Sequence, residues 1–497
     1  MGTIKIQQMS FSYDGAKEKI FSNVNLSIDG TWKLGLIGRN GRGKTTLLRI
    51  LRGQLAYQGL VEANLQFNYF PAQVDNLNEV TQTLVLQSLQ IDESELWKVQ
   101  IEMDQLGLTD DVLWKPFSEL SPGQQTKLLL AVCFSQPDQF ALIDEPTNHL
   151  DAAGRQVVAK YLQQKTGFII ISHDREFLNL VIDHVISIDR QQIQLLKGNY
   201  DTWKTVFDQN NLNEANQKIK IEREVKQLQQ SAAQTKSWAE NAEKSKNKSN
   251  HQNQQVNLDK GFISHKAAKV MKKARNTLKR TEAGIAEKEE LLKNVETINA
   301  LSMNYMACRK TILTVQQLQI KRDNRTLLKT PFDISIEPGQ RIILQGVNGS
   351  GKSTILHAIL DQPTLRSKGQ VNWTTNVKVS YVSQTFDDLA GTLKDYANFY
   401  QIELSEILNM LRKLGFERET FNVLLQDMSM GQQRKISLAR SMCEAANIYI
   451  WDEPLNYLDV IARQEIEALI DDYQPTMIVV DHDNIFTQAI GTKFLSI

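Results

Sequence analysis

The chain has 497 residues, of which 41% are hydrophobic and 23% are charged, and its 57 lysines and arginines balance its 57 aspartates and glutamates. This length is too great for one hydrophobic core and predicts two or three domains. No stretch approaches the roughly 18 consecutive apolar residues of a membrane helix, so we expect no membrane span. The first residues carry no charged segment followed by an apolar run, so we expect no signal peptide and a cytoplasmic protein.

The chain repeats itself. Residues 6–14 (IQQMSFSYD) align with residues 315–323 (VQQLQIKRD), and the same motifs then follow in the same order at similar spacing. We therefore predict an α/β fold with two similar domains, 1–207 and 309–497, flanking a linker at 208–308. The three cysteines, Cys133, Cys308 and Cys443, form no CxxC pair, which argues against disulfides and against zinc.

A phosphate-binding loop opens the first copy. An apolar strand is expected at 32–37, the sequence GRNGRGKT follows at 38–45, and an apolar helix is expected at 46–51. Glycines let backbone N–H groups turn toward phosphate, and the helix N-terminus adds its positive dipole end. Lys44 would reach the β- and γ-phosphates, and Thr45 would hold Mg²⁺. The ATP-binding candidates of this loop are Gly38, Asn40, Gly41, Gly43, Lys44, Thr45 and Thr46.

Two further strands of the first copy end in functional candidates. The strand 140–145 closes on Asp144, which can support Mg²⁺, and on Glu145, which can orient the attacking water. The strand 168–171 is followed by His173, which we expect to contact the γ-phosphate. A lone histidine in that place would usually be an ordinary loop residue, but the second copy repeats it.

The second copy carries the same set. Its phosphate loop, GVNGSGKS at 346–353, follows a strand at 341–344, and the strands 448–453 and 478–480 precede the acids and the histidine. Its ATP-binding candidates are Gly346, Asn348, Gly349, Gly351, Lys352, Ser353 and Thr354. Its Mg²⁺ candidates are Ser353 and Asp452, and its catalytic candidates are Glu453 and His482. Two such loops in register make a chance match of one glycine-rich loop an inadequate explanation.

Between loop and acidic strand lie LSPGQQ at 120–125 and MSMGQQ at 428–433. These resemble the LSGGQ signature of ATP-binding cassette ATPases, with Pro122 and Met430 at the third position. The resemblance implies a head-to-tail pairing of the two cassettes within one monomeric chain, each ATP lying between one phosphate loop and the other cassette's signature. Site one would then use Ser429, Gly431 and Gln432, and site two would use Ser121, Gly123 and Gln124.

Further motifs narrow this resemblance to one class of ATP-binding cassette ATPases. The sequences FSYD at 11–14, DEPTNHLD at 144–151, KGNYD at 197–201 and WDEPLNYLD at 451–459 resemble the ABC-F class, which has two cassettes, no transmembrane domain and a helical linker. AAKVMKK at 267–273 and LRKLG at 411–415 add similarity to the Lsa-type antibiotic-resistance group. The resemblance covers essentially the whole chain and implies ATP and Mg²⁺ as cofactors, with no other metal.

Some positions depart from the family pattern. Tyr13 is expected to stack on adenine, with a core tyrosine as the alternative, whereas the second copy has Arg322, which could stack through a cation–π contact. In the first Q-loop Ala72 occupies the usual glutamine position and Gln73 follows it, whereas Gln384 is in place in the second. Gln73 and Gln384 are both candidates to contact Mg²⁺. The short spacing from Q-loop to signature predicts that the arm insertion of some ABC-F proteins is absent or reduced.

The linker is basic. Between 236 and 280 stand twelve lysines and arginines and three acids, a local net charge of +9 in a neutral chain. Apolar residues spaced by three and four on both sides of a polar middle predict a long antiparallel helical hairpin. Arms of roughly 30 residues would project on the order of 45 Å, which is longer than joining two cassettes requires. Because this projection is basic, we expect a polyanionic partner, namely nucleic acid.

The turn of this hairpin, 247–262, is polar, with isolated apolar tip residues Val256, Leu258 and Phe262. By itself such a turn could be a disordered loop. By resemblance to ABC-F proteins it enters the ribosomal E site, leans on the P-site tRNA and points toward the peptidyl transferase centre. The expected contacts to RNA phosphates are Lys266, Lys269, Lys272, Lys273 and Arg275, the alternative being a solvated helix face.

Together these features favour a ribosome-protection ATPase whose partners are the 70S ribosome, its 23S rRNA and the P-site tRNA. Resemblance implies protection against lincosamides, streptogramin A compounds and pleuromutilins. A housekeeping translation factor of the same class and the ATPase subunit of a transporter remain alternatives. The sequence does not decide which drugs are affected, whether the tip touches the drug, or whether both sites hydrolyse ATP.

Overall fold

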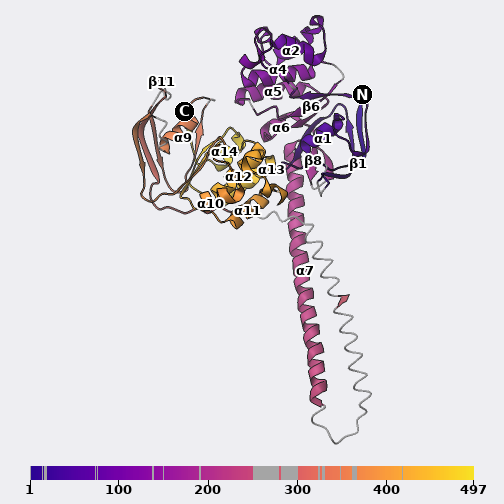
Figure 1. Cartoon of the computed structure of the whole chain (residues 1–497), viewed down its shortest axis with the longest axis vertical. Coiled ribbons are helices and arrows are strands. Elements are labelled where there is room, and N and C mark those ends of the chain that lie inside the picture. Colours follow the sequence, from indigo (N-terminus) through magenta and orange to yellow (C-terminus); the bar gives the residue numbers. More distant parts are fainter. Residues whose placement is uncertain are drawn as a thin grey trace. The chain divides into compact units, whose positions relative to one another are not determined.

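The computed structural model describes residues 2–13, 15, 19–72, 74, 76–136, 139–148, 150–189, 192–249, 279–280, 300–322, 325–326, 331–346, 349–360, 366–416 and 418–497. Two compact units result: Met1–Trp203 with Ala300–Ile497, and Lys204–Asn299. Figure 1 follows the chain through both. The first unit contains both cassettes, and the second is the linker.

The first cassette has two sheets. Strands β1 (Thr3–Phe11), β2 (Phe21–Asp29) and β4 (Gln58–Ala63) form an antiparallel sheet in the order β2-β1-β4. The larger sheet runs β5-β6-β7-β3-β8-β9, in which β9 alone is antiparallel to its neighbour. Its strands are β5 (Gln66–Phe70), β6 (Gln139–Asp144), β7 (Phe168–Ile171), β3 (Lys33–Gly38), β8 (His184–Asp189) and β9 (Gln192–Lys197).

Helices surround these sheets. Those of the first cassette are α1 (Lys44–Leu51), α2 (Thr81–Leu89), α3 (Trp97–Gln105), α4 (Pro122–Phe134), α5 (Ala152–Gln164) and α6 (Arg175–Val181), with short 3₁₀ turns at Glu93–Glu95, Asp110–Trp114 and Phe117–Glu119. The central strand β7 is completely buried and uniformly apolar, as a parallel strand covered on both faces must be.

The second cassette repeats the first. Its parallel sheet runs β15-β16-β17-β13-β18, which matches β5-β6-β7-β3-β8 strand for strand. These strands are β15 (Val379–Val382), β16 (Ile448–Asp452), β17 (Met477–Val480), β13 (Arg341–Gln345) and β18 (Lys493–Ser496). The smaller sheet contains β10 (Leu313–Arg322), β11 (Arg325–Thr326), β12 (Phe332–Ile336) and β14 (Arg366–Trp373). The predicted fold of two cassettes in tandem is confirmed.

The helices of the second cassette also correspond to those of the first. They are α9 (Lys352–Ile359), α10 (Leu393–Phe399), α11 (Leu404–Lys413), α12 (Met430–Cys443), α13 (Val460–Tyr473) and α14 (Asn484–Ile490), with 3₁₀ turns at Arg418–Asn422 and Leu425–Asp427. Each cassette buries its own apolar core: Leu34, Leu142 and Ile169 lie in the first, and Ile342, Ile450 and Ile478 lie at the equivalent places in the second.

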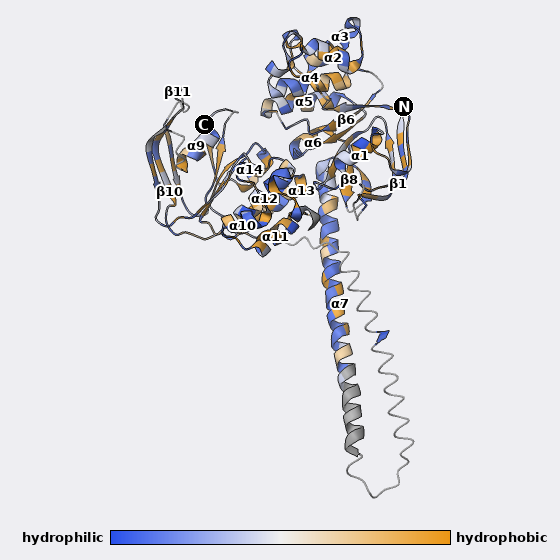
Figure 2. Ribbon diagram, viewed as in Figure 1, coloured by the Kyte–Doolittle hydropathy of each residue, from blue (hydrophilic) through white to orange (hydrophobic). Residues whose placement is uncertain are grey.

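A single helix, α7 (Tyr200–Ser249), is 50 residues long and begins before the predicted linker boundary at 208. In Figure 2 it is mostly blue, with separate orange residues along its length. The spacing predicted for the first arm agrees with the burial: Val225 is buried and Ile221, Leu228 and Ala232 are half-buried, whereas most neighbouring side chains are exposed. Most of the predicted second arm lies outside the described residues.

Over the described parts of the chain, none of the helices combines the length and the apolarity that crossing a membrane requires.

Candidate nucleotide sites

The topology gathers the candidate residues at one edge of each sheet. In the first cassette the phosphate loop follows β3, His173 follows β7, the acids close β6 and the Q-loop follows β5. Since these strands are parallel neighbours, their carboxyl ends meet, which is where open α/β sheets bind ligands. The second cassette places its equivalents after β13, β17, β16 and β15 in the same order.

The first phosphate loop turns into α1 through Gly43, which has a φ of 93°. A Cβ at Gly43 would lie 2.5 Å from Ile20 and 2.8 Å from Phe21, so glycine is required on both conformational and steric grounds. The Lys44 Nζ donates to the Gly38 carbonyl at 2.7 Å and to Asn40 Oδ1 at 3.1 Å. Burial lowers the pKa of Lys44, although Asp459 and Glu145 oppose that shift.

Asp144 lies beside the hydroxyl predicted to hold Mg²⁺. Its Oδ2 accepts from Thr45 Oγ1 at 3.2 Å and from Tyr69 OH at 3.3 Å. Burial raises the pKa of Asp144 above its ordinary value, while these two hydrogen bonds act against the shift. A hydroxyl and a carboxylate next to a phosphate loop are the oxygen ligands that Mg²⁺ uses together with nucleotide phosphates.

Glu145 and His173 face each other in the first cassette. Glu145 has a φ of 52°, and its two buried carboxylate oxygens have no hydrogen-bond partner within the described chain. His173 Nε2 lies 3.1 Å from Glu145 Oε1, without the alignment of a hydrogen bond. Burial, followed by the charge of Asp144, raises the pKa of Glu145 to about 7. Burial and the charge of Lys44 hold the pKa of His173 well below its ordinary value.

The second cassette has the same groups with different electrostatics at its glutamate. Lys352 Nζ donates to the Gly346 carbonyl at 2.9 Å, and burial raises the pKa of Asp452 to about 6, against a hydrogen bond from Ser353. Apart from this interaction with Ser353, the two buried carboxylate oxygens of Asp452 have no hydrogen-bond donor among the described residues, so they suit a cation or its water shell. This pair, Ser353 and Asp452, corresponds to Thr45 and Asp144.

Glu453 is a better hydrogen-bonded carboxylate than Glu145. It accepts from Asn456 Nδ2 at 2.6 Å and from the side chain of Gln384, and His482 Nε2 lies 3.6 Å from its Oε1. Burial acts to raise its pKa, but the hydrogen bonds from His482, Gln384 and Asn456 lower it below the ordinary value. The pKa values of the two predicted catalytic glutamates are therefore shifted in opposite directions, upward for Glu145 and downward for Glu453.

The two cassettes meet at site one. The backbone N–H of Asn40 donates to Asp459 Oδ2 at 3.0 Å, and Asn40 Nδ2 donates to the Tyr457 carbonyl at 2.9 Å. A Cβ on the signature residue Gly431 would lie 3.1 Å from Asn40 Nδ2. The second cassette's signature thus lies against the first phosphate loop, as the head-to-tail arrangement requires.

Each signature begins a helix through the same capping box. Ser121 accepts from the Gln124 backbone and Gln124 bonds back to Ser121, and Ser429 and Gln432 do the same before α12. Pro122 stands at the first helical position, where its fixed φ and missing N–H are tolerated. The helix therefore begins in the same way in both cassettes despite the departures from LSGGQ. The Met430 side chain is largely exposed.

For several ATP-binding candidates, the hydrogen bonds among the described residues stay within their own cassette. Ser121 hydrogen-bonds within its own signature in the described chain. Tyr13 is 42% exposed and is therefore not the core tyrosine of the alternative; its hydroxyl bonds Thr46 Oγ1 at 3.1 Å. Gly349 and Gly351 have positive φ and open space around them, and Thr354 follows Ser353 in α9.

Other candidates lie outside the described residues. They are Gln73, Asn348, the linker residues Lys266, Lys269, Lys272, Lys273 and Arg275, and the tip residues Val256, Leu258 and Phe262. Arg322 ends β10, and its side chain is likewise outside the description. Their predicted roles stay predictions.

Sequence reasoning missed residues that join the sites. Asp459 is completely buried and binds Lys435 at 3.2 Å besides Asn40. Arg434 is also buried and donates to the carbonyls of Ser383 and Gln384, so it fixes the second Q-loop. Asp151 and Asp459 stand in the repeated motifs DEPTNHLD and DEPLNYLD, and this repetition could have identified them.

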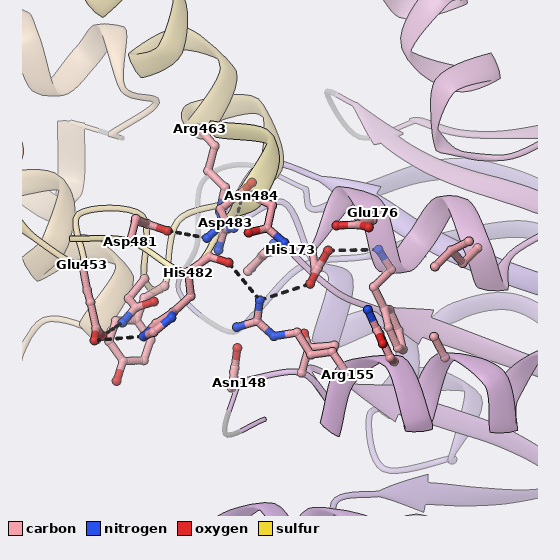
Figure 3. A pocket seen from close by; sticks show the side chains of 18 of the residues that line it. Asn148, Arg155, His173, Glu176, Glu453, Arg463, Asp481, His482, Asp483 and Asn484 are labelled. Carbon is pink, nitrogen blue, oxygen red and sulfur yellow. Dashed lines mark hydrogen bonds and ion pairs between the residues drawn. The ribbon is translucent and has the colours of Figure 1, made fainter. Parts of the chain in front are cut away.

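A cavity of about 300 Å³ lies where the two histidine loops approach each other (Figure 3). His173, His482, Arg155 and Arg463 are among its lining residues. Arg155 Nη1 donates to Asp174 at 3.4 Å and to the His482 carbonyl at 3.5 Å, so one arginine contacts both histidine loops. Arg463 pairs with Asp483 at 3.2 Å.

Comparison with known proteins gives the class. The family model described as ABC transporter matches residues 21–148 and 330–456, which is one match in each cassette and more than half of the chain. The chain belongs to this family of ATP-binding cassette proteins and, having two cassettes in tandem and a long helix between them, is an ATPase of the ABC-F type.

Individual relatives span nearly the whole chain. The ribosome protection protein VmlR of Bacillus subtilis is 29% identical over 98% of this chain and 85% of its own length. The probable ATP-binding protein YbiT of Escherichia coli O157:H7 is 26% identical over 96% of this chain and 93% of its own. Archaeal ABCE1 bound to its ribosomal stalk protein shares the fold, with a TM-score of 0.58 and 18% identity over 98% of this chain and 87% of that one.

Proposed function

We propose that this protein is a cytoplasmic ABC-F ATPase that binds the E site of the 70S ribosome and protects the peptidyl transferase centre from bound antibiotics. ATP binding at the paired sites favours the form that engages the ribosome, and hydrolysis permits release. The drugs would be lincosamides, streptogramin A compounds and pleuromutilins, and the group that the chain would join is the Lsa type.

The observation that carries this proposal is that one helix connects the ATP sites to the linker. Gln464 of α13, in the second cassette, donates to the hydroxyl of Tyr200, the first residue of α7. From Tyr200 the helix continues for 50 residues, on the order of 75 Å at 1.5 Å per residue. A change at the cassette interface is thus joined by direct contact and by covalent continuity to a long helix that leads into the basic segment.

Two further observations support it. The relative VmlR is named as a ribosome protection protein, and its match covers 98% of this chain. The linker sequence between 236 and 280 has a net charge of +9, which suits the phosphates of 23S rRNA and of the P-site tRNA. Lys266, Lys269, Lys272, Lys273 and Arg275 would make those contacts, and Val256, Leu258 and Phe262 would form the tip.

At each site the chain's own residues have distinct roles in this proposal. Glu145 and Glu453 orient and polarise the attacking water, and His173 and His482 contact the γ-phosphate. Bound Mg²⁺ neutralises phosphate charge; Thr45 with Asp144, and Ser353 with Asp452, would hold it, assisted by Gln384 and Gln73. Lys44 and Lys352 exchange their carbonyl contacts for phosphate oxygens.

The test is the double variant Glu145→Gln with Glu453→Gln, which should bind ATP without turning it over. We expect it to co-sediment with 70S ribosomes in ATP, and the wild-type protein to do so only transiently. Absence of the double variant from the ribosome pellet contradicts the proposal. Binding should weaken as salt rises from about 50 to 200 mM, because phosphate contacts release counterions.

A housekeeping translation factor of the same class is the second candidate, favoured by relatives such as YbiT that are named only as ATP-binding proteins. Drug susceptibility of cells with and without the protein separates the two: equal susceptibility together with ribosome binding supports the housekeeping role. Recovery with membranes rather than ribosomes would instead favour a transporter ATPase.

A further inference from the structure

Two ion pairs join the cassettes at site one. Arg39, in the first phosphate loop, places its two terminal nitrogens 2.5 and 3.3 Å from the carboxylate oxygens of Glu465. Arg175, at the start of α6, donates to Glu467 at 2.9 Å. Both arginines belong to the first cassette, and both glutamates lie on α13 of the second, two positions apart.

Both pairs are shielded from solvent. The side chains of Arg39 and Glu465 are 17% and 16% exposed, and those of Arg175 and Glu467 are 6% and 25% exposed. Arg175 also lies 3.7 Å from Asp483. Burial acts to lower the pKa of Arg175, but Asp483 and Glu467 more than offset it, so the pKa is raised. The Arg39–Glu465 pair is bidentate, and bidentate, partly desolvated arginine–carboxylate pairs are the stronger kind of ion pair.

The repeat supplies no reciprocal pairs. Aligning the two copies by their motifs places Val347 opposite Arg39 and Val157 opposite Glu465. In the same way Asn484 corresponds to Arg175, and Ala159 corresponds to Glu467. All four charges of the two pairs are therefore replaced by neutral residues where site two would need them.

The two aspartates that end the repeated motifs, Asp151 and Asp459, also differ between the sites in their exposure to solvent. Asp459, which contacts the phosphate loop of site one, is completely buried, whereas Asp151, its counterpart for site two, is exposed. Asp151 caps its own helix, accepting from the Gly154 N–H at 2.7 Å. The structure thus joins the second cassette to the phosphate loop of site one through a buried aspartate, whereas the equivalent aspartate for site two is exposed.

We propose that the ion pairs Arg39–Glu465 and Arg175–Glu467 keep site one closed between turnovers, so that the cassettes open at site two. Site one then acts as the hinge of the ATPase cycle, and product leaves it more slowly than it leaves site two. This asymmetry depends on the tandem cassettes alone and is independent of the ribosome.

The test measures release of the fluorescent nucleotide mant-ADP from the full-length chain by stopped flow. Lys352→Ala leaves site one as the binding site, and Lys44→Ala leaves site two. In both backgrounds we add Glu465→Gln with Glu467→Gln, which removes both carboxylate charges and keeps every candidate nucleotide-binding residue. We expect release from site one to be slower than from site two, and to accelerate by about tenfold in the double glutamine variant.

The salt dependence and a charge-conserving substitution distinguish an electrostatic effect of the two ion pairs from an effect of side-chain packing. Release from site one should accelerate with salt in the parent protein and lose that dependence in the double glutamine variant. Glu465→Asp with Glu467→Asp keeps the charges and should restore part of the slow release, and Lys115→Ala, which breaks the exposed pair with Asp111, should change nothing. If the double variant does not fold, Glu465→Gln alone provides the same comparison. Equal release from the two sites, or equal acceleration at both, would overturn the proposal.

Discussion

Asn40 donates its backbone N–H to Asp459 Oδ2 at 3.0 Å, which joins the backbone of one cassette's phosphate loop to a carboxylate of the other cassette. Lys435 binds the same oxygen at 3.2 Å. Burial opposes ionisation of Asp459, but the charges of Lys435 and Lys44 hold its pKa far below the ordinary value. The Asp459 carboxylate is therefore ionised, and it binds the first cassette through Asn40 and its own cassette through Lys435.

Asp459→Ala should destabilise the nucleotide-free protein far more than Asp151→Ala. Removal of Asp459 leaves Lys435 buried and unpaired, which costs on the order of 3–5 kcal/mol. Asp151 is an exposed helix cap, whose loss costs about 1 kcal/mol. Chemical denaturation of the full chain, carried out on both variants and on the wild type, measures the difference. Equal shifts for the two variants would contradict the buried anionic role of Asp459.

Glu145→Gln should stabilise the nucleotide-free protein increasingly as pH rises. The pKa of Glu145 is raised from 4.5 to about 7 in the folded state, so the native chain holds a proton that the unfolded chain has lost. The stability that this proton confers is present below pH 4.5 and is lost as pH rises toward 7. Between pH 5 and pH 8 the variant should gain at most about 3 kcal/mol relative to wild type.

Glu453→Gln provides the matched control, because the pKa of Glu453 is lowered. Its charged form stabilises the fold above the ordinary pKa, and that contribution is lost only in acid. The variant should therefore be less stable than wild type at pH 8 and approach it as pH falls below the ordinary pKa of glutamate. Thermal melts at several pH values measure the stability of both variants. If stability depends on pH in the same way in the two variants, the pKa values of the two glutamates are not shifted in opposite directions.

Gly431→Ala should impair ATP turnover while leaving helix α12 intact. A Cβ there would lie 2.8 Å from the Tyr457 carbonyl of the same cassette and 3.1 Å from Asn40 Nδ2 of the first phosphate loop, so the contacts of the signature at site one must shift. Alanine is otherwise favoured over glycine inside a helix by about 1 kcal/mol. Steady-state ATPase rates and thermal melts should thus move independently, with the rate falling and the melting temperature kept. A full rate would show that Gly431 does not need this close approach.

Asp481→Ser should raise stability at alkaline pH. Asp481 is half-buried and accepts from the Asp483 N–H at 2.8 Å, and desolvation raises its pKa to about 6. Ser172 has the same role in the first cassette, accepting from the Asp174 N–H at 3.2 Å. The wild-type protein loses the stabilising proton as pH rises through about 6, whereas serine has none to lose. Melts at pH 5 and pH 8 measure the gain, which should be confined to the higher pH.

Sequence reasoning located the strands, loops and acids of both cassettes because each motif combines an apolar strand with chemically unusual residues. The strand predicted at 168–171 is β7 in full, and the phosphate loops follow β3 and β13 as expected. It could not find Arg39, Arg175, Glu465 and Glu467 as partners. Charged residues on helix surfaces are common, and only their spatial pairing distinguishes them.

What the sequence determined by itself is the repeat, the two phosphate loops and the chemistry at the strand ends, since these depend on local residue types at fixed spacing. Only the tertiary structure decided which groups share an environment. Glu145 and Glu453 occupy identical motif positions, yet burial beside Asp144 raises the pKa of one, while His482, Gln384 and Asn456 lower that of the other. Desolvation and hydrogen bonding come from residues remote in sequence, and only folding brings those residues together.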